Sequence, residues 1–142
     1  MYRLLLLCSD NSVLSPMAEG YFRHYKQDDA EIYSAGIALK KIDPIAVKIM
    51  KEDKIDISQL KQHNLSDLRH IDFDYILTFD KESETESHRL PSKSVKYHFD
   101  FKKLLVKDTV ESTDEMYRNL RNHIKKAIQS FIKEHFTSIQ AS

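Results

Sequence analysis

The segment best suited to chemistry starts with a cysteine, which is followed by hydroxyl, carboxylate and amide side chains. It runs from Cys8 to Pro16 and reads CSDNSVLSP, between the aliphatic run Tyr2–Cys8 and a segment with apolar residues at helical spacing. A turn from a strand into a helix N-terminus directs backbone N–H groups and the positive end of the helix dipole at one place. We therefore expect this turn to attract an oxyanion and to bring the pKa of the Cys8 thiol below about 8.5.

The elements that must position this loop alternate between short apolar strands and amphipathic helices. Strands are expected at Tyr2–Cys8, Ala30–Ser34, Asp74–Phe79 and Val95–Phe99. Helices are expected from the cap Ser15 and the first helical residue Pro16 to about Lys26, from Asp43-Pro44 to about Asp53, and over Glu115–Phe136. Shorter or irregular segments are expected at Ser66–His70, Lys81–Arg89 and Phe101–Glu111. This order predicts an α/β three-layer sandwich, a four-stranded parallel sheet flanked by helices, with ligands beyond the carboxyl ends of the strands.

Length, charge and cysteine content narrow the function classes further. The 142 residues suit one domain spanning 1–142, and 22 Lys and Arg balance 22 Asp and Glu. Neither nucleic acid nor an anionic membrane is therefore an expected partner, and without a signal peptide or a membrane span the expected location is the cytoplasm. Because Cys8 is the single cysteine and no two of the seven histidines lie four residues apart, neither a metal site nor a cofactor is expected.

The stretch CSDNSVLSPMAEGYFRHY, residues 8–25, resembles the signature of low-molecular-weight tyrosine phosphatases and thioredoxin-coupled arsenate reductases. That signature is a cysteine, five residues, an arginine, and a serine or threonine. Similar segments follow in the family's order and spacing: YSAGI (33–37), Asp43-Pro44, KEDKIDIS (51–58) and DFDYILTFD (72–80). Within the family, these segments resemble the arsenate reductase branch most. The resemblance implies the same four-stranded α/β fold that the order of elements predicts.

The resemblance also implies a site for phosphate, arsenate or sulfate in the loop after the first strand. Cys8 takes the position of the nucleophile, and Ser15 that of the hydroxyl after the arginine. Asn11 and Ser12 match residues that support the loop and the thiolate. The residues that would surround the anion are Ser9, Asp10, Asn11, Ser12, Val13 and Leu14.

Several positions depart from the family's pattern. Leu14 replaces the arginine that grips two oxygens of the anion, a bidentate contact that an isobutyl group cannot make. Asp10 replaces a glycine, so we expect backbone strain and repulsion of the anion there. The Asp-Pro general acid is missing; Lys103 aligns with it, and Asp100 lies nearby. The two relay cysteines of the reductases correspond to Asp80 and to a position near Ser87.

Three functions remain open at this point. The first is a family member with lost or much weakened catalysis that acts by binding a protein or a small ligand. The second is an active Cys8-dependent phosphatase or arsenate reductase, in which Arg69, Arg89 or Lys103 supplies the positive charge and an external thiol replaces the relay. The third is a thiol sensor. The alternative to all three functions is that Cys8 has no chemical role and is only a small apolar residue at the end of a strand.

Overall fold

A parallel sheet of five strands forms the centre of the molecule. The computed structural model describes residues 2–25, 30–91, 93–105 and 112–141, with side chains as far as residue 136. The strands are β1 (Tyr2–Cys8), β2 (Ala30–Gly36), β3 (His63–Asn64), β4 (Tyr75–Thr78) and β5 (Val95–His98). They lie in the order β3-β2-β1-β4-β5, and every neighbouring pair is parallel.

The four predicted strands are confirmed, but the prediction of a four-stranded sheet is wrong. The additional strand β3 pairs Ala35 with His63 and Gly36 with Asn64. It has only two residues, both half-buried and neither apolar, so hydrophobic patterning gives no signal for it.

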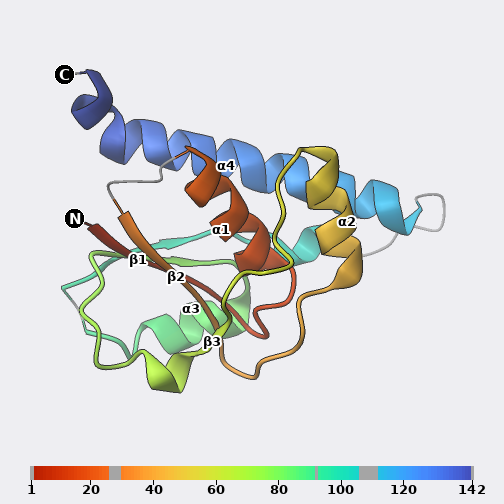
Figure 1. Cartoon of the computed structure of the whole chain (residues 1–142). Helices are drawn as coiled ribbons and strands as arrows, with labels where there is room; N and C mark the ends of the chain where they lie inside the picture. Colours follow the sequence, from red (N-terminus) through yellow and green to blue (C-terminus); the bar gives the residue numbers. More distant parts are fainter. Residues whose placement is uncertain (1, 26–29, 92, 106–111, 142) are drawn as a thin grey trace.

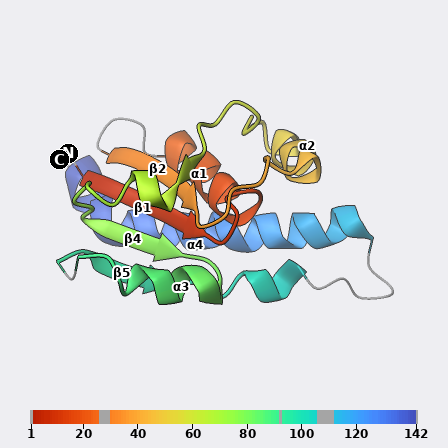
Figure 2. The same ribbon diagram turned by 90° about the horizontal axis from the view of Figure 1, so that it is seen from below.

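Helices cover both faces of the sheet. The helices α1 (Leu14–Tyr25), α2 (Pro44–Glu52) and α4 (Thr113–Ala141) lie on one face, and α3 (Lys81–Ser87) lies on the other with the short 3₁₀ turn η1 (Leu65–Asp67). Figure 1 shows α4 above the sheet beside α1 and α2, and Figure 2 shows that it runs along the length of the molecule. The α/β architecture of helices on both sides of a parallel sheet is therefore confirmed.

The central strand β1 separates two hydrophobic clusters. Leu4 and Leu6 belong to the larger cluster under α1 and α4, whereas Leu5 and Leu7 belong to the smaller cluster on the face of α3. All four leucines are completely buried. This explains the unbroken aliphatic run, because a strand covered on both faces has no solvent-exposed side.

Local sequence signals explain where most helices begin. The N-cap of α2 is Asp43, whose carboxylate accepts a hydrogen bond from the Ile45 N–H at 2.8 Å, and Pro44 follows as the first helical residue. The N-cap of α3 is Asp80, which forms a capping box with Ser83. The connection expected to be irregular starts with a second 3₁₀ turn, η2 (Lys102–Leu105). Its residues 106–111 lie outside the described part of the chain.

The start of α1 differs from its prediction. The helix begins at Leu14, so Ser15 is not its cap, and Ser15 and Pro16 lie within the first turn. Proline fits there because the first N–H groups of a helix have no acceptor within it. The predicted end at Lys26 lies outside the described residues. None of the described helices combines the length and low charge needed to cross a bilayer.

Candidate functional site at the end of the central strand

The loop between β1 and α1 is held along its length by the segment that follows β2. The Ser9 carbonyl accepts the N–H groups of residues 37 and 38, both at 2.9 Å. The Asp10 carbonyl accepts the N–H of residue 40 at 3.0 Å, and the Ser12 carbonyl accepts that of Asp43 at 2.9 Å. This ladder fixes the loop at the carboxyl edge of the sheet, where ligands of parallel α/β folds bind. The topology thus brings the predicted site residues together.

Gly36 allows this close approach of the two segments. A Cβ atom at position 36 would lie 2.8 Å from the Asp10 carbonyl carbon and 3.0 Å from the Asn11 backbone nitrogen. Both neighbours are backbone atoms, which cannot move aside as a flexible side chain would. Only glycine therefore fits at the end of β2.

Asn11, and not Asp10, carries the unusual backbone conformation of the loop. The φ angle of Asn11 is 55°, and Asp10 is not among the described residues with positive φ, so the strain predicted at Asp10 is absent. Asparagine tolerates this left-handed region better than most residues. The Asn11 side-chain amide donates to the Ser34 carbonyl at 3.4 Å, and its Oδ1 accepts from the Ser15 hydroxyl at 2.7 Å.

The Asp10 carboxylate turns back onto the loop. Its Oδ1 accepts hydrogen bonds from the Ser12 N–H at 3.1 Å and from the Ser12 hydroxyl at 2.8 Å. The Asp80 carboxylate accepts the N–H of Ser9 at 2.9 Å. Two backbone donors that an oxyanion would need are thus already bound to carboxylates of the protein.

Cys8, Ser15 and Asn11 form a short chain of hydrogen bonds. Cys8 Sγ lies 3.0 Å from Ser15 Oγ, and Ser15 Oγ donates to Asn11 Oδ1 at 2.7 Å. The Asn11 amide nitrogen faces the carbonyl of Ser34, which only accepts, and this fixes the orientation of the amide. Either the thiol or the Ser15 hydroxyl can donate in the contact between them, and a Ser15 hydroxyl that donates to sulfur lowers the pKa of the Cys8 thiol.

The expectation of a lowered pKa for Cys8 is wrong in this structure. The side chain is 1% exposed, and this burial raises the pKa of the Cys8 thiol above its ordinary value; hydrogen bonding to Ser15 acts against the rise, and the charge of Asp80 adds to it. The loss of hydration outweighs the lowering effect of the hydrogen bonds from Ser15 and Asn11. Burial also acts to raise the pKa of Asp80, but hydrogen bonds from Ser83 and Ser9 lower it, so this carboxylate stays charged.

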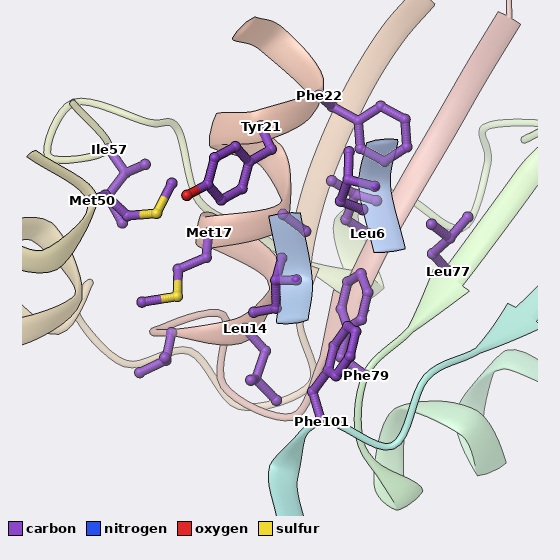
Figure 3. Packing of buried hydrophobic residues seen from close by; sticks show 14 of the residues in the cluster. Leu6, Leu14, Met17, Tyr21, Phe22, Met50, Ile57, Leu77, Phe79 and Phe101 are labelled. Atoms are coloured by element: carbon purple, nitrogen blue, oxygen red, sulfur yellow. The ribbon is translucent and has the colours of Figure 1, made fainter. Parts of the chain in front are cut away.

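Leu14 points into the core and not over the loop. It is 5% exposed and belongs to the same buried cluster as Cys8. Figure 3 shows Leu14 near Phe79 and Phe101 in that cluster. Leu14 begins the apolar stripe that α1 continues at helical spacing through Met17, Ala18 and Tyr21, all of them buried. The position of the family's arginine has therefore become a core position.

Three aromatic rings from the segments just after β4 and β5 pack at this part of the cluster. Phe79, Phe99 and Phe101 stack with centroid distances of 5.6 to 6.1 Å, and the Phe101 N–H donates to the Phe79 carbonyl at 3.3 Å. Asp100 and Lys103, the two residues considered for the general acid, are exposed on either side of the buried Phe101.

The other residues proposed for catalysis have different roles. Arg69 and Arg89 both contact the Glu86 carboxylate on α3, at 3.3 and 3.1 Å. Ser87, at the second relay position, is buried and donates its hydroxyl proton to the Glu84 carbonyl at 2.7 Å.

Sequence reasoning missed three residues that hold the loop: Gly36, Gln62 and Asp80. The Gln62 amide donates to the Asn11 carbonyl at 2.8 Å and to the Lys40 carbonyl at 2.6 Å. The scarcity of glycine could have identified Gly36, and the capping pattern after β4 could have identified Asp80. No sequence signal marks Gln62.

Cavities of about 390, 450 and 510 Å³ lie among the described residues. None of these three is lined by residues 8–14. Within the same part of the chain, no three His, Cys, Asp or Glu side chains are grouped so that they could hold a metal ion.

Comparison with known proteins shows the family and the fold. The family described as low molecular weight phosphotyrosine protein phosphatase matches residues 3–141. An arsenate reductase of Shouchella clausii is 33% identical over 133 residues, and arsenate reductase 1 of Staphylococcus epidermidis is 34% identical over 132; each alignment covers 90% of this chain and 93% of the relative. The low molecular weight protein tyrosine phosphatase of T. tengcongensis superposes with a TM-score of 0.72 over 94% of this chain and 99% of that one, at 23% identity.

Proposed function

The chain belongs to the low molecular weight phosphotyrosine protein phosphatase family, and from this premise we propose that it is a member with a closed anion site and lost or much weakened catalysis. The observation that carries the proposal is the place of Leu14 in the core, at the position of the family's arginine. A leucine there offers an oxyanion neither charge nor a hydrogen bond. Losing such an electrostatic clamp costs about 10²–10³ in rate.

The loop itself adds to this loss. The Asp10 carboxylate binds the Ser12 N–H and hydroxyl, so an oxyanion must displace a negative charge of the protein before it reaches that donor. The exchange is unfavourable for phosphate or arsenate, which would also lie close to the carboxylate that they displace. We therefore expect any oxyanion to bind weakly.

Cys8 is a poor nucleophile in this environment. Because burial raises the pKa of the Cys8 thiol above its ordinary value, the neutral thiol is favoured at neutral pH, and the thiolate is the form that acts as nucleophile. Near-complete burial also disfavours the role of a thiol sensor, since oxidation follows thiolate character and exposure. What remains is a folded scaffold that acts by binding a protein or a small ligand.

One observation favours the second candidate, an active Cys8-dependent phosphatase or arsenate reductase. The support for the cysteine is intact, because Cys8, Ser15 and Asn11 still form a continuous chain of hydrogen bonds. Catalysis would require this loop to open and the Ser15 proton to turn toward sulfur. It would also require a cation and an external thiol in place of the missing arginine and relay cysteines.

Turnover measurements separate the two candidates. The purified protein and Cys8→Ala are assayed with p-nitrophenyl phosphate, and with arsenate in the presence of glutathione or a thioredoxin system. We expect the two proteins to be indistinguishable in every assay. Robust turnover that disappears in Cys8→Ala would overturn the proposal and establish the enzyme. As a positive control, Asp10→Gly combined with Leu14→Arg restores the family's pattern at both positions.

A further inference from the structure

Asp43 joins three parts of the molecule beside the loop between β1 and α1. Its N–H donates to the Ser12 carbonyl at 2.9 Å, the last hydrogen bond of the ladder that fixes this loop. Its carboxylate accepts the Ile45 N–H at the start of α2, and the other carboxylate oxygen accepts the Tyr117 hydroxyl of α4 at 2.6 Å. The loop, α2 and α4 therefore meet at one half-buried side chain.

The Tyr117 hydroxyl is a durable donor to this carboxylate. Tyr117 is 8% exposed and belongs to the larger buried cluster. Burial raises the pKa of the Tyr117 hydroxyl above its ordinary value, and the bond to Asp43 and the charges of Asp43 and Asp10 raise it further. The hydroxyl therefore keeps its proton throughout the neutral range. A hydrogen bond to a carboxylate is about twice as strong as one between neutral groups.

The loop is bound at Ser12 from two directions. The Asp10 carboxylate accepts the N–H and the hydroxyl of Ser12, and the Asp43 N–H donates to the Ser12 carbonyl. The first of these contacts lies within the loop, so the loop keeps it when it moves. The second joins the loop to the start of α2, and opening of the loop must break it.

The same end of α4 is attached to α2 by a second contact. Lys48 Nζ of α2 lies 2.6 Å from the carboxylate of Asp114, three residues before Tyr117. Figure 1 shows α2 beside the N-terminal half of α4. The packing of α4 on α2 thus determines where the Tyr117 hydroxyl lies.

We propose that Tyr117 is a positioning residue that keeps the loop closed over Cys8 by holding Asp43, so that the packing of α4 on α2 controls access to the thiol. Without the Tyr117 hydroxyl, the Asp43 carboxylate loses a donor, its backbone N–H leaves the Ser12 carbonyl more readily, and the loop opens more often. The inference rests on the proposed closed site and names what keeps that site closed.

The other end of α2 provides a matched control. The Tyr21 hydroxyl donates to the carboxylate of Asp53, the C-cap of α2, at 2.7 Å. Tyr21 is completely buried, and within the described residues Asp53 has no hydrogen bond to residues 9–13. Tyr21→Phe therefore removes the same kind of bond from the same helix and leaves the loop contacts in place.

The first test measures how fast iodoacetamide alkylates Cys8 in the wild-type protein and in the two variants. Because Cys8 is 1% exposed, the reagent reaches it only through an opening of the structure. We expect Tyr117→Phe to react about tenfold faster, the effect of one hydrogen bond to a charged group, and Tyr21→Phe to stay within about twofold of wild type. The rate should depend on urea less steeply than global unfolding does, since a loop opening exposes less surface.

Hydrogen exchange of single amides gives a readout that does not involve the thiol. Exchange of the Asp43 N–H should be about tenfold faster in Tyr117→Phe and unchanged in Tyr21→Phe. In Tyr21→Phe the Asp53 N–H should exchange faster instead. A general loss of stability would not produce this exchange of positions.

Asp43→Asn tests the contact from its other side. Asparagine caps a helix as well as aspartate does, but its amide group replaces one of the two accepting oxygens. We expect the same faster alkylation as in Tyr117→Phe, and a double variant that reacts no faster than either single variant, because both substitutions remove one contact.

Unchanged alkylation and exchange in Tyr117→Phe would overturn the inference. Equal acceleration in Tyr117→Phe and Tyr21→Phe would also overturn it, and so would a urea dependence equal to that of global unfolding. Turnover of p-nitrophenyl phosphate is measured on the same samples. Turnover by the wild-type protein that disappears in Cys8→Ala would refute the loss of catalysis and leave these rate ratios unchanged, so the two failures are distinguishable.

Discussion

Replacing Leu14 by alanine tests whether the arginine position of the family has become part of the core. The Leu14 side chain is 5% exposed and packs in the cluster that contains Cys8, Phe79 and Phe101. Buried Leu→Ala substitutions cost about 2–5 kcal/mol, from lost transfer free energy and the cavity left behind. Because Leu14 lies at the first residue of α1, where the loop can partly collapse, we expect a loss of about 3 kcal/mol in the free energy of unfolding.

Urea denaturation followed by circular dichroism measures this loss. With an m-value of about 2 kcal/mol per M, the midpoint should fall by about 1.5 M. The matched control is Leu39→Ala, the same chemical change at a leucine that is 42% exposed. We expect that variant to lose less than about 1 kcal/mol, because little apolar surface is removed from contact there.

A small effect at Leu14 would refute the reasoning. If Leu14 lay over the loop in solvent, as the family's arginine must in order to grip an anion, Leu14→Ala would resemble the control. If the losses in the free energy of unfolding of the two variants differ by less than about 1 kcal/mol, the Leu14 side chain lies at the anion site and not in the core. The closed-site proposal would then lose its main support.

Other perturbations follow from the same structure. Cys8 should be alkylated by iodoacetamide slowly at neutral pH and faster only above about pH 9. Because the folded protein keeps a thiol proton that the unfolded chain releases, the free energy of unfolding should fall as the pH rises past about 9, and Cys8→Ser should lack that part of the fall. Gly36→Ala should lower the midpoint of thermal unfolding more than Gly20→Ala, whose Cβ would meet only side-chain atoms; equal effects would contradict the loop packing. The hydrogen bond from Arg118 lowers the pKa of Glu52 to about 2. The contribution of the Glu52 carboxylate to the free energy of unfolding is therefore complete above about pH 4.5 and is lost as the pH falls toward 2. Acid titration of Glu52→Gln should show a shallower loss of stability in that window.

Much of the fold follows from the sequence because each element has its own physical signal. The buried run Leu4–Leu7, the Asp43-Pro44 cap and the apolar stripe of α4 each specify an element without reference to the rest of the chain. The strand β3 escapes prediction because its two residues are neither apolar nor fully buried, and they pair only because β2 lies beside them.

The structure brings together residues that the family pattern groups, but their chemical state does not follow from that pattern. The family pattern places Cys8, Asn11 and Ser15 correctly in one loop, yet the direction of the Leu14 side chain depends on where α1 begins. The helical spacing of Leu14 with Met17 and Tyr21 carries that information, whereas Ser15 and Pro16 form a competing start signal one residue later. The raised pKa of Cys8 follows from the burial of its own side chain, and no local sequence pattern reveals how complete that burial is.

The position of β1 in the centre of the sheet has a consequence for how the chain is made. β1 gains its neighbour β2 soon after its own synthesis, but its other neighbour β4 is made much later, and the Ser9 N–H waits for the carboxylate of Asp80, 71 residues further on. At about 5–20 residues per second this interval is about 4–14 s. During that time the leucines of β1 have only part of their cover, and α4, which shields one face of them, is synthesised after all five strands. A nascent chain of this protein is therefore most open to aggregation, and most in need of a chaperone, before α4 emerges.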